Sequence, residues 1–112
     1  MLNFGVVALG VTDVQRAAEF WSAALGYTLR EDGFGGWAKL LFPPDEAGTA
    51  IALQLSQTRP QAHPRLHFDL HVADIGEQEA EAARLISLGA TRVEWDSYPE
   101  DPDFIDLSHE HR

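Results

Sequence analysis

The chain has 112 residues, the size of one domain, and 45% of them are hydrophobic, enough to form a core. Its 18 acidic and 8 basic residues give a formal net charge of −10, whereas nucleic-acid and anionic-membrane binders carry basic patches. The lack of cysteine excludes disulfides, thiolate metal ligands and cysteine nucleophiles. The first residues lack the charged region expected of a signal peptide, and the longest apolar runs are well short of the ~20 residues of a membrane span. We therefore expect a cytoplasmic protein with no nucleic-acid or membrane partner.

The first half of the sequence predicts one strand, one helix and three further strands. Residues 4–11 are apolar and β-branched, which is typical of a strand. Thr12 and Asp13 supply an N-cap for a helix over 14–25, and Gly26 is suited to end it. Three more strands are predicted, over 27–30, 37–42 and 50–55, with a hairpin turn marked by Asp32-Gly33 and Gly35-Gly36.

The second half repeats this order. Residues 66–72 alternate between apolar and polar side chains, which predicts a half-buried strand. Asp74 is the expected N-cap of a helix over about 75–88. Strands are then predicted over 91–95 and 104–107.

The two halves correspond to each other. Val11-Thr12-Asp13 matches Val72-Ala73-Asp74, and Leu25-Gly26 matches Leu88-Gly89. This correspondence indicates a duplicated βαβββ unit. The sequence thus predicts an α+β fold, a single domain over 1–112, built from module one (1–57) and module two (64–112). The last strand of module two is expected to be short or missing.

The arrangement resembles the vicinal oxygen chelate superfamily, which includes glyoxalase I, bleomycin-resistance proteins and extradiol dioxygenases. The resemblance is carried by Val11-Thr12-Asp13, by Phe20-Trp21 with Leu25-Gly26-Tyr27, and by Arg65 to Val72, and is most similar to glyoxalase-like domain proteins. It implies two modules that form a cleft, usually completed in a homodimer. It also implies a divalent metal that chelates two adjacent oxygens of a substrate.

The resemblance places metal-ligand positions on four parts of the chain. The first falls on Val6, which cannot bind a metal, and the second on Gln54, which can coordinate weakly through its amide oxygen. The third falls on His67, which matches the family residue. The fourth would require Glu110 or one of the histidines beside it. If a metal is bound, His67, Gln54 and Glu110 are its candidate ligands, and Zn, Ni, Fe or Mn would suit them. A protein without metal is the open alternative.

Other residues are candidate ligand contacts. Asp69 and His71 share the polar face of their predicted strand with His67, and Trp37 shares a face with Lys39. An aromatic side chain stacks on a planar ligand, and a lysine pairs with an anion. The structural alternative is a solvated strand face, with Trp37 as a core or rim aromatic. No catalytic residue is identified.

Two main functions remain open, beside a weaker third one in which the chain is a partner domain that acts only by association through exposed sheet edges. The first is a small-molecule binding protein with a degenerate metal site, whose ligand is held in the cleft between the two modules. The second is a metal-dependent lyase, isomerase or dioxygenase that chelates vicinal oxygens of a small substrate. Val6 favours the first and His67 favours the second, so whether the protein is an enzyme stays open.

Overall fold

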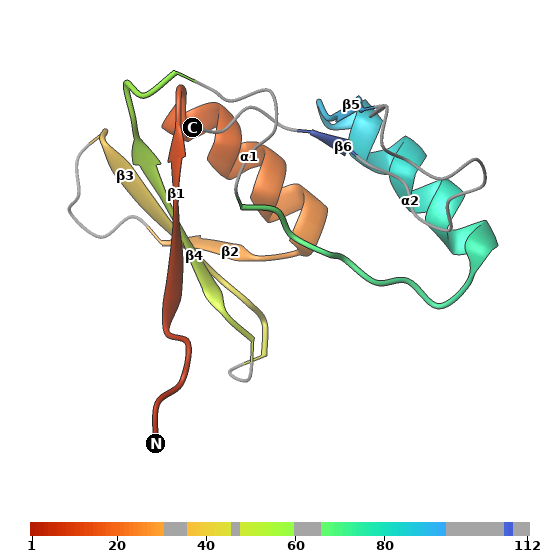
Figure 1. Cartoon of the computed structure of the whole chain (residues 1–112), viewed down its shortest axis with the longest axis horizontal. Helices are drawn as coiled ribbons and strands as arrows, with labels where there is room; N and C mark the ends of the chain where they lie inside the picture. Colours follow the sequence, from red (N-terminus) through yellow and green to blue (C-terminus); the bar gives the residue numbers. More distant parts are fainter. Residues whose placement is uncertain (31–35, 46–47, 60–65, 94–106, 109–112) are drawn as a thin grey trace. The chain divides into compact units, whose positions relative to one another are not determined.

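The computed structural model describes residues 1–30, 36–45, 48–59, 66–93 and 107–108 (Figure 1). The chain divides into two compact units, of which the first includes Met1–Arg65 and the second is Leu66–His109. Predictions that fall on 31–35, 94–106 or Glu110 lie outside the described residues. None of the helices in the described ranges is long and apolar enough to cross a membrane.

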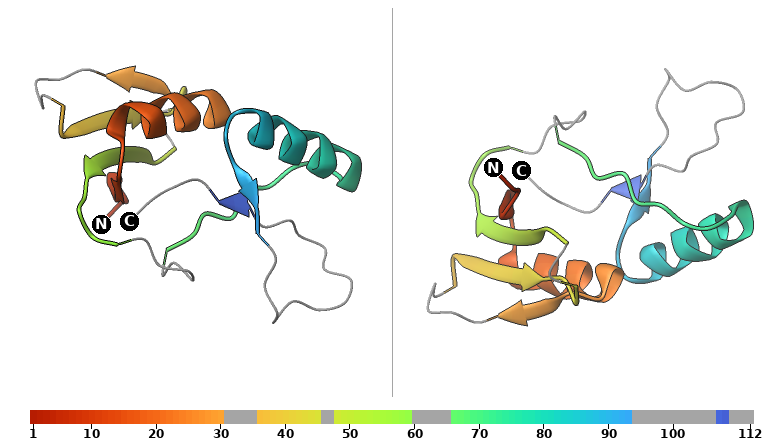
Figure 2. Two further views of the ribbon diagram at one scale, coloured as in Figure 1. Left: turned by 90° about the horizontal axis from the view of Figure 1, so that it is seen from above. Right: turned by 90° about the horizontal axis from the view of Figure 1, so that it is seen from below.

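The first unit is a four-stranded sheet with one helix. Its strand order is β1-β4-β3-β2, with β1 parallel to β4 and the other pairs antiparallel. The helix α1 crosses one face of this sheet (Figures 1 and 2). The elements are β1 (Val6–Val11), α1 (Val14–Leu25), β2 (Thr28–Arg30), β3 (Ala38–Phe42) and β4 (Ala50–Leu55). All five predicted elements are present, and α1 and β4 have the predicted bounds.

Local side-chain chemistry sets both ends of α1. The Asp13 carboxylate accepts a hydrogen bond of 3.1 Å from the backbone N–H of Arg16, which satisfies a donor that the first helical turn leaves unpaired. At the other end, Gly26 adopts φ 70° and its N–H donates to the carbonyl of Ser22. Glycine takes this left-handed conformation without steric cost. The predicted N-cap and C-terminal glycine are therefore confirmed.

The core of the first unit lies between α1 and the sheet. Leu41, Leu53 and Val11 are its largest fully buried side chains, one on each of three neighbouring strands. Alternate residues of a strand point to opposite faces, so the residues in phase with these three also face the helix. The helix contributes four buried residues, Val14, Ala17, Ala18 and Phe20.

The second unit contains one helix and a short antiparallel pair of strands. These are α2 (Ile75–Ser87), β5 (Thr91–Arg92) and β6 (Leu107–Ser108). Asp74 caps α2 by accepting from the N–H of Glu77 at 2.8 Å, and the Glu77 carboxylate accepts in return from the N–H of Ala73. These reciprocal bonds resemble a capping box.

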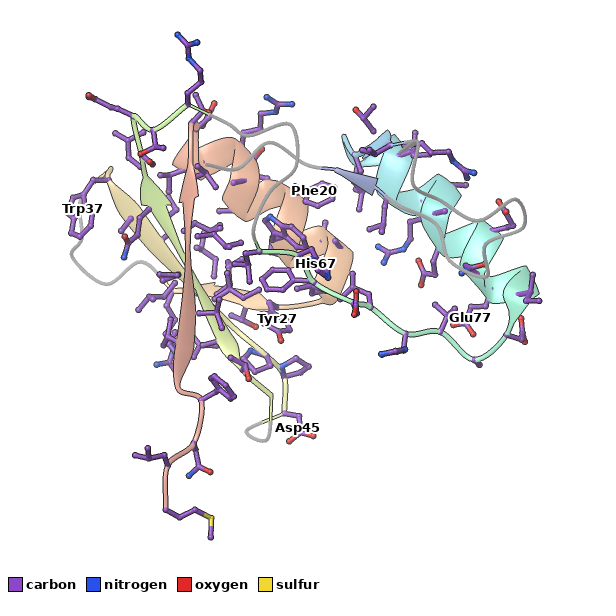
Figure 3. The ribbon with its side chains drawn as sticks, in the orientation of Figure 1. Phe20, Tyr27, Trp37, Asp45, His67 and Glu77 are labelled. Carbon is purple, nitrogen blue, oxygen red and sulfur yellow. The ribbon has the colours of Figure 1, made fainter. Side chains whose placement is uncertain are left out.

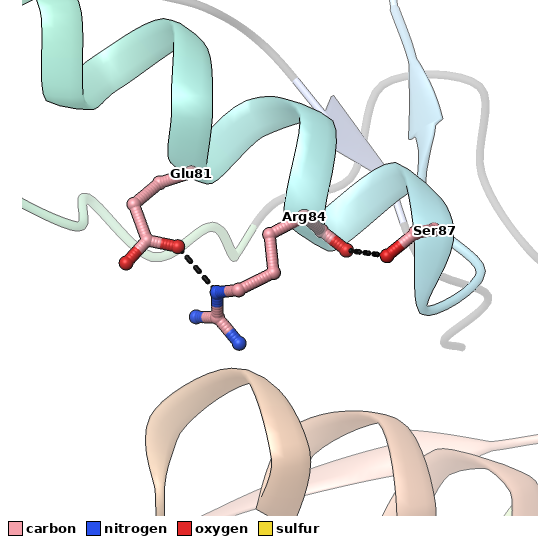
Figure 4. A network of polar contacts seen from close by, with 3 residues as sticks. All are labelled: Glu81, Arg84 and Ser87. Atoms are coloured by element: carbon pink, nitrogen blue, oxygen red, sulfur yellow. Dashed lines mark hydrogen bonds and ion pairs between the residues drawn. The ribbon is translucent and has the colours of Figure 1, made fainter.

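Exposed polar contacts continue along α2 (Figure 4). Arg84 pairs with Glu81 on the preceding turn. The Ser87 hydroxyl donates to the carbonyl oxygen of Arg84 at 2.6 Å. Arg92 of β5 lies 3.6 Å from the carboxylate of Glu79. Surface pairs of this kind contribute little to stability, about 0–1 kcal/mol each, so α2 depends mainly on its caps and its packing.

The prediction of a strand over 66–72 is wrong. These residues form no strand, and Leu66, Leu70 and Val72 on their apolar side are 39–52% exposed. A strand exists only when its backbone groups pair with a neighbouring strand, and no described residue pairs with this segment. The alternation indicates that one side of the segment is apolar, but it does not provide a second strand with which the segment can pair. The mixed α+β class is nevertheless the predicted one.

Candidate ligand-binding site

The sheet face away from α1 is crossed by a single row of side chains. In the strand registers Ala8 pairs with Ala52, Ala52 with Leu40, and Leu40 with Arg30. Side chains that are opposite in register point to the same face. The row therefore crosses all four strands, from β1 to β2, over about 14 Å at the usual strand spacing. We call this side of the sheet the open face.

Residues with small side chains form the middle of the open face. Gly10 pairs with Gln54, which in turn pairs with Ala38, and Val6 pairs with Ala50. Four alanines and one glycine thus form a patch that extends over three strands. We call this patch the alanine floor; its residues are Ala8, Gly10, Ala38, Ala50 and Ala52. Gln54 is exposed and is the one side chain with a polar group among β1 and β4. The alanine floor is apolar, with an amide at one end, and its residues Ala38, Ala50 and Ala52 are buried at 5–8% exposure.

Arg30 places a positive charge on β2, at the other edge of the open face. The Arg30 guanidinium carbon lies 4.1 Å from the centroid of the Phe42 ring. Thr28 pairs with Phe42 and Arg30 with Leu40, so Arg30 and Phe42 are diagonal neighbours on one face. Arg30 is exposed, and no carboxylate of the described residues pairs with it. The ring positions the guanidinium without neutralising it.

The strand residues that form the open face include no acidic group. The four strands contain no Asp, Glu or His, although the chain as a whole has a net charge of −10. An apolar surface with a few polar groups at its margin is the usual composition of a small-molecule site. The arrangement can hold a flat apolar ligand and offer it one cation and one amide.

Trp37 and Lys39 are not brought together with Gln54. Lys39 pairs with Leu53, which is fully buried on the α1 side of the sheet. The Trp37 carbonyl accepts from the N–H of Leu55 at 2.7 Å, which continues the same register and places Trp37 in phase with Lys39. Trp37 directly precedes β3 and is exposed (Figure 3). The two residues do share a face, but it is the face opposite Gln54.

The metal-ligand positions that the resemblance implied are also separated within this sheet. Gly10, and not Val6, is the β1 residue beside Gln54, while Val6 lies beside Ala50 toward the other end of the strands. Neither Gly10 nor Val6 has a side chain that binds a metal. The described residues contain no group of three or more His, Asp or Glu that could hold a metal ion, and Glu110 is not among them. The donors of the described part of the chain therefore do not fit the implied metal.

The histidine candidates lie in the second unit. Figure 3 labels His67. Its Nε2 is 3.8 Å from the Asp69 carboxylate, and the two side chains are 75% and 80% exposed. That separation is an ion-pair distance and too long for a hydrogen bond. His71 is exposed as well. Because the segment is not a strand, its three polar residues are not aligned as predicted, and their roles stay predictions.

Arg30 and Phe42 were not recognised as site residues from the sequence. The signal was present in part, because Leu40 and Phe42 alternate with Lys39 along β3 and so share a face. Assigning Arg30 to that face requires the register of β2 with β3, which joins residues on either side of a turn. Periodicity within one strand does not contain that information.

Comparison with known proteins identifies the family. The model of the glyoxalase-like domain family matches residues 6–105, which is most of the chain. The chain belongs to the glyoxalase-like domain family. The vicinal oxygen chelate superfamily inferred from the sequence is thereby confirmed. No match was found among curated proteins.

Solved structures share the fold of this glyoxalase-like chain. One is a glyoxalase/bleomycin resistance protein/dioxygenase family enzyme from Burkholderia phytofirmans, with a TM-score of 0.65 and 15% identity over 87% of this chain and 83% of that one. Another is a possible glyoxalase from Bacillus cereus, with a TM-score of 0.63 and 19% identity over 83% and 80%. A glyoxalase-related enzyme from Fulvimarina pelagi has a TM-score of 0.60 and 18% identity over 89% and 74%. At these identities the likeness establishes the fold alone, because one fold supports many reactions.

Proposed function

We propose that this glyoxalase-like protein binds a small molecule on the open face of its first sheet and that its metal site is degenerate. The observation that carries the proposal is the alanine floor, an apolar surface whose polar neighbours in the four strands, Thr28, Arg30 and Gln54, lie at its margins. Ala8 on β1 is exposed, whereas Ala38, Ala50 and Ala52 are only 5–8% exposed, so the accessible part of the floor includes Ala8.

The donor chemistry of the open face supports the metal part of the proposal. Among the residues of β1 and β4, Gln54 has the one side chain that can coordinate a metal. Its amide oxygen is a weak ligand for zinc-like ions. Three protein ligands are the usual minimum for a catalytic zinc site. Completion of the cleft by the second module and by a partner subunit stays part of this proposal.

A neutral fluorescent probe tests the binding function. Phenylnaphthylamine fluoresces when it enters an apolar site, and we expect saturable binding to the full-length protein. Ala8 is exposed on the open face, so Ala8→Phe should fill the floor and abolish the saturable signal. Ala23 is exposed on α1, so Ala23→Phe adds the same ring elsewhere and should leave the signal unchanged. Equal binding by both variants would overturn the proposed site.

The alternative of a metal-dependent lyase, isomerase or dioxygenase is favoured by His67 and its neighbour Asp69. Metal analysis of protein purified without a histidine tag separates the two functions. We expect no stoichiometric metal in the wild-type protein and no change on His67→Ala. Stoichiometric Zn, Ni, Fe or Mn that disappears in His67→Ala would establish the enzyme alternative instead.

A further inference from the structure

We propose that the open face selects planar organic anions, and that Arg30 is the residue that pairs with their carboxylate or sulfonate group. The inference rests on the proposed binding function and adds the class of ligand. It follows from three features of the described residues: the state of Arg30, the charge around it, and the shape of the surface beside it.

Arg30 is held in place while its hydrogen-bond donors remain available. Its guanidinium lies over the Phe42 ring at 4.1 Å, a cation–π contact that restricts the side chain to the open face. No carboxylate of the described residues pairs with it, so its N–H groups are not committed to an ion pair with that part of the chain. A planar guanidinium presents these donors in a fork that matches the two oxygens of a carboxylate.

Among the residues of the four strands, the charge favours an anion beside Arg30; Glu31 and Asp32, which follow Arg30 in the chain, lie outside the described residues. The chain has a net charge of −10, so most of its surface repels anions. The four strands carry no acidic side chain, and their two cations lie on opposite faces, Arg30 on the open face and Lys39 on the α1 side. Apolar neighbours lower the local dielectric and strengthen the attraction between Arg30 and a bound anion.

The surface beside Arg30 suits a flat apolar body. The row from Arg30 through Leu40 and Ala52 to Ala8 extends about 14 Å, long enough for a two-ring ligand lying across the strands. Two of the four residues in the row are alanines, of which Ala8 is exposed and Ala52 is 7% exposed. The Gln54 amide, one row away on β4, can accept or donate a hydrogen bond to a polar substituent.

Two probes with one skeleton test the ligand class. Anilinonaphthalene sulfonate is phenylnaphthylamine with a sulfonate group added, so the ratio of the two affinities isolates the contribution of the anion. We expect wild-type protein to prefer the sulfonate and Arg30→Gln to bind it about tenfold more weakly, since a hydrogen-bonded ion pair is lost. The affinity of the neutral probe should change less than about twofold. Added salt should weaken sulfonate binding to the wild type more than to Arg30→Gln.

Matched variants locate the effect. Lys39→Gln removes the same charge from the opposite face and should leave both affinities unchanged. Arg30→Lys keeps the charge without the fork and should retain part of the preference. Thr28 is exposed on the same face as Arg30, so Thr28→Glu supplies a carboxylate beside it and should reduce sulfonate binding as Arg30→Gln does.

The outcomes distinguish this inference from the proposed function on which it rests. If Ala8→Phe blocks both probes but Arg30→Gln leaves their affinity ratio unchanged, the open face binds ligands and the anion selectivity is overturned. If Lys39→Gln lowers sulfonate binding as much as Arg30→Gln does, the effect is one of net charge and the assignment to Arg30 is overturned. If Ala8→Phe changes neither probe, the proposed binding site itself fails.

Discussion

The Tyr27 hydroxyl donates a hydrogen bond of 3.0 Å to the carbonyl oxygen of Thr49. Tyr27 directly precedes β2 and Thr49 directly precedes β4, and these two strands are separated in the sheet by β3. The bond therefore joins two segments that no strand pairing connects. It helps to hold β2, and with it Arg30, in register with the rest of the open face.

Removal of this hydroxyl should cost measurable stability. We expect Tyr27→Phe to lower the free energy of unfolding by about 1 kcal/mol, because the ring stays in place while a part-buried hydrogen bond is lost and the Thr49 carbonyl loses its partner. Urea denaturation followed by circular dichroism measures this change. An unchanged midpoint would show that water replaces the hydroxyl at no cost.

Adjacent leucines of β3 should respond very differently to truncation. Leu41 is fully buried against α1, and Leu41→Ala should destabilise the protein by roughly 2–5 kcal/mol through lost burial and the cavity left behind. Leu40 is half-buried on the open face, so Leu40→Ala should cost well under half as much. The comparison uses the same substitution on neighbouring residues. Similar losses for both variants would contradict the assignment of the two sheet faces.

The backbone conformation of Gly26 predicts a specific effect of substitution. Gly26→Ala should cost about 1 kcal/mol, because alanine is strained at φ 70° although no neighbouring atom lies within 4 Å of an added Cβ. Gly26→Asn should cost less, since asparagine tolerates the left-handed region. Gly5 also has free space for a Cβ and has no positive φ, which makes Gly5→Ala the matched control. Thermal unfolding of the three variants measures the order.

The Asp13 cap should act through hydrogen bonding at the N-terminus of α1. We expect Asp13→Ala to lower the free energy of unfolding by about 1 kcal/mol, since the Arg16 N–H loses its acceptor. Asparagine caps helices about as well, so Asp13→Asn should retain most of the stability. Urea midpoints of the two variants provide the test. Equal destabilisation by both would attribute the effect to charge and not to the cap.

The helices were predictable because their determinants are local. The apolar spacing of Val14–Leu25, its Asp13 cap and its Gly26 terminator all lie within one segment of the chain, and α1 has the predicted bounds. The same applies to Asp74 and α2. Four strands of the first unit were also predicted, since short apolar runs between turn residues identify them.

The segment 66–72 was predicted incorrectly for a physical reason. Its alternation of apolar and polar residues satisfies the pattern of a strand, yet a strand requires a second strand to pair with. Pairing partners are distant in sequence, and the pattern of one segment does not identify them. The predicted alignment of His67, Asp69 and His71 depended on that strand and does not occur.

The amino-acid sequence by itself determined the mixed α+β class, the helix ends, the apolar strands and the glyoxalase-like family. It also determined which residues of each strand share a face, because side chains alternate along an extended backbone. Only the tertiary structure decided which of these faces packs on α1. That choice depends on hydrogen-bonded registers between separate strands, which place Lys39 beside buried Leu53 and Arg30 beside Leu40 at the edge of the alanine floor.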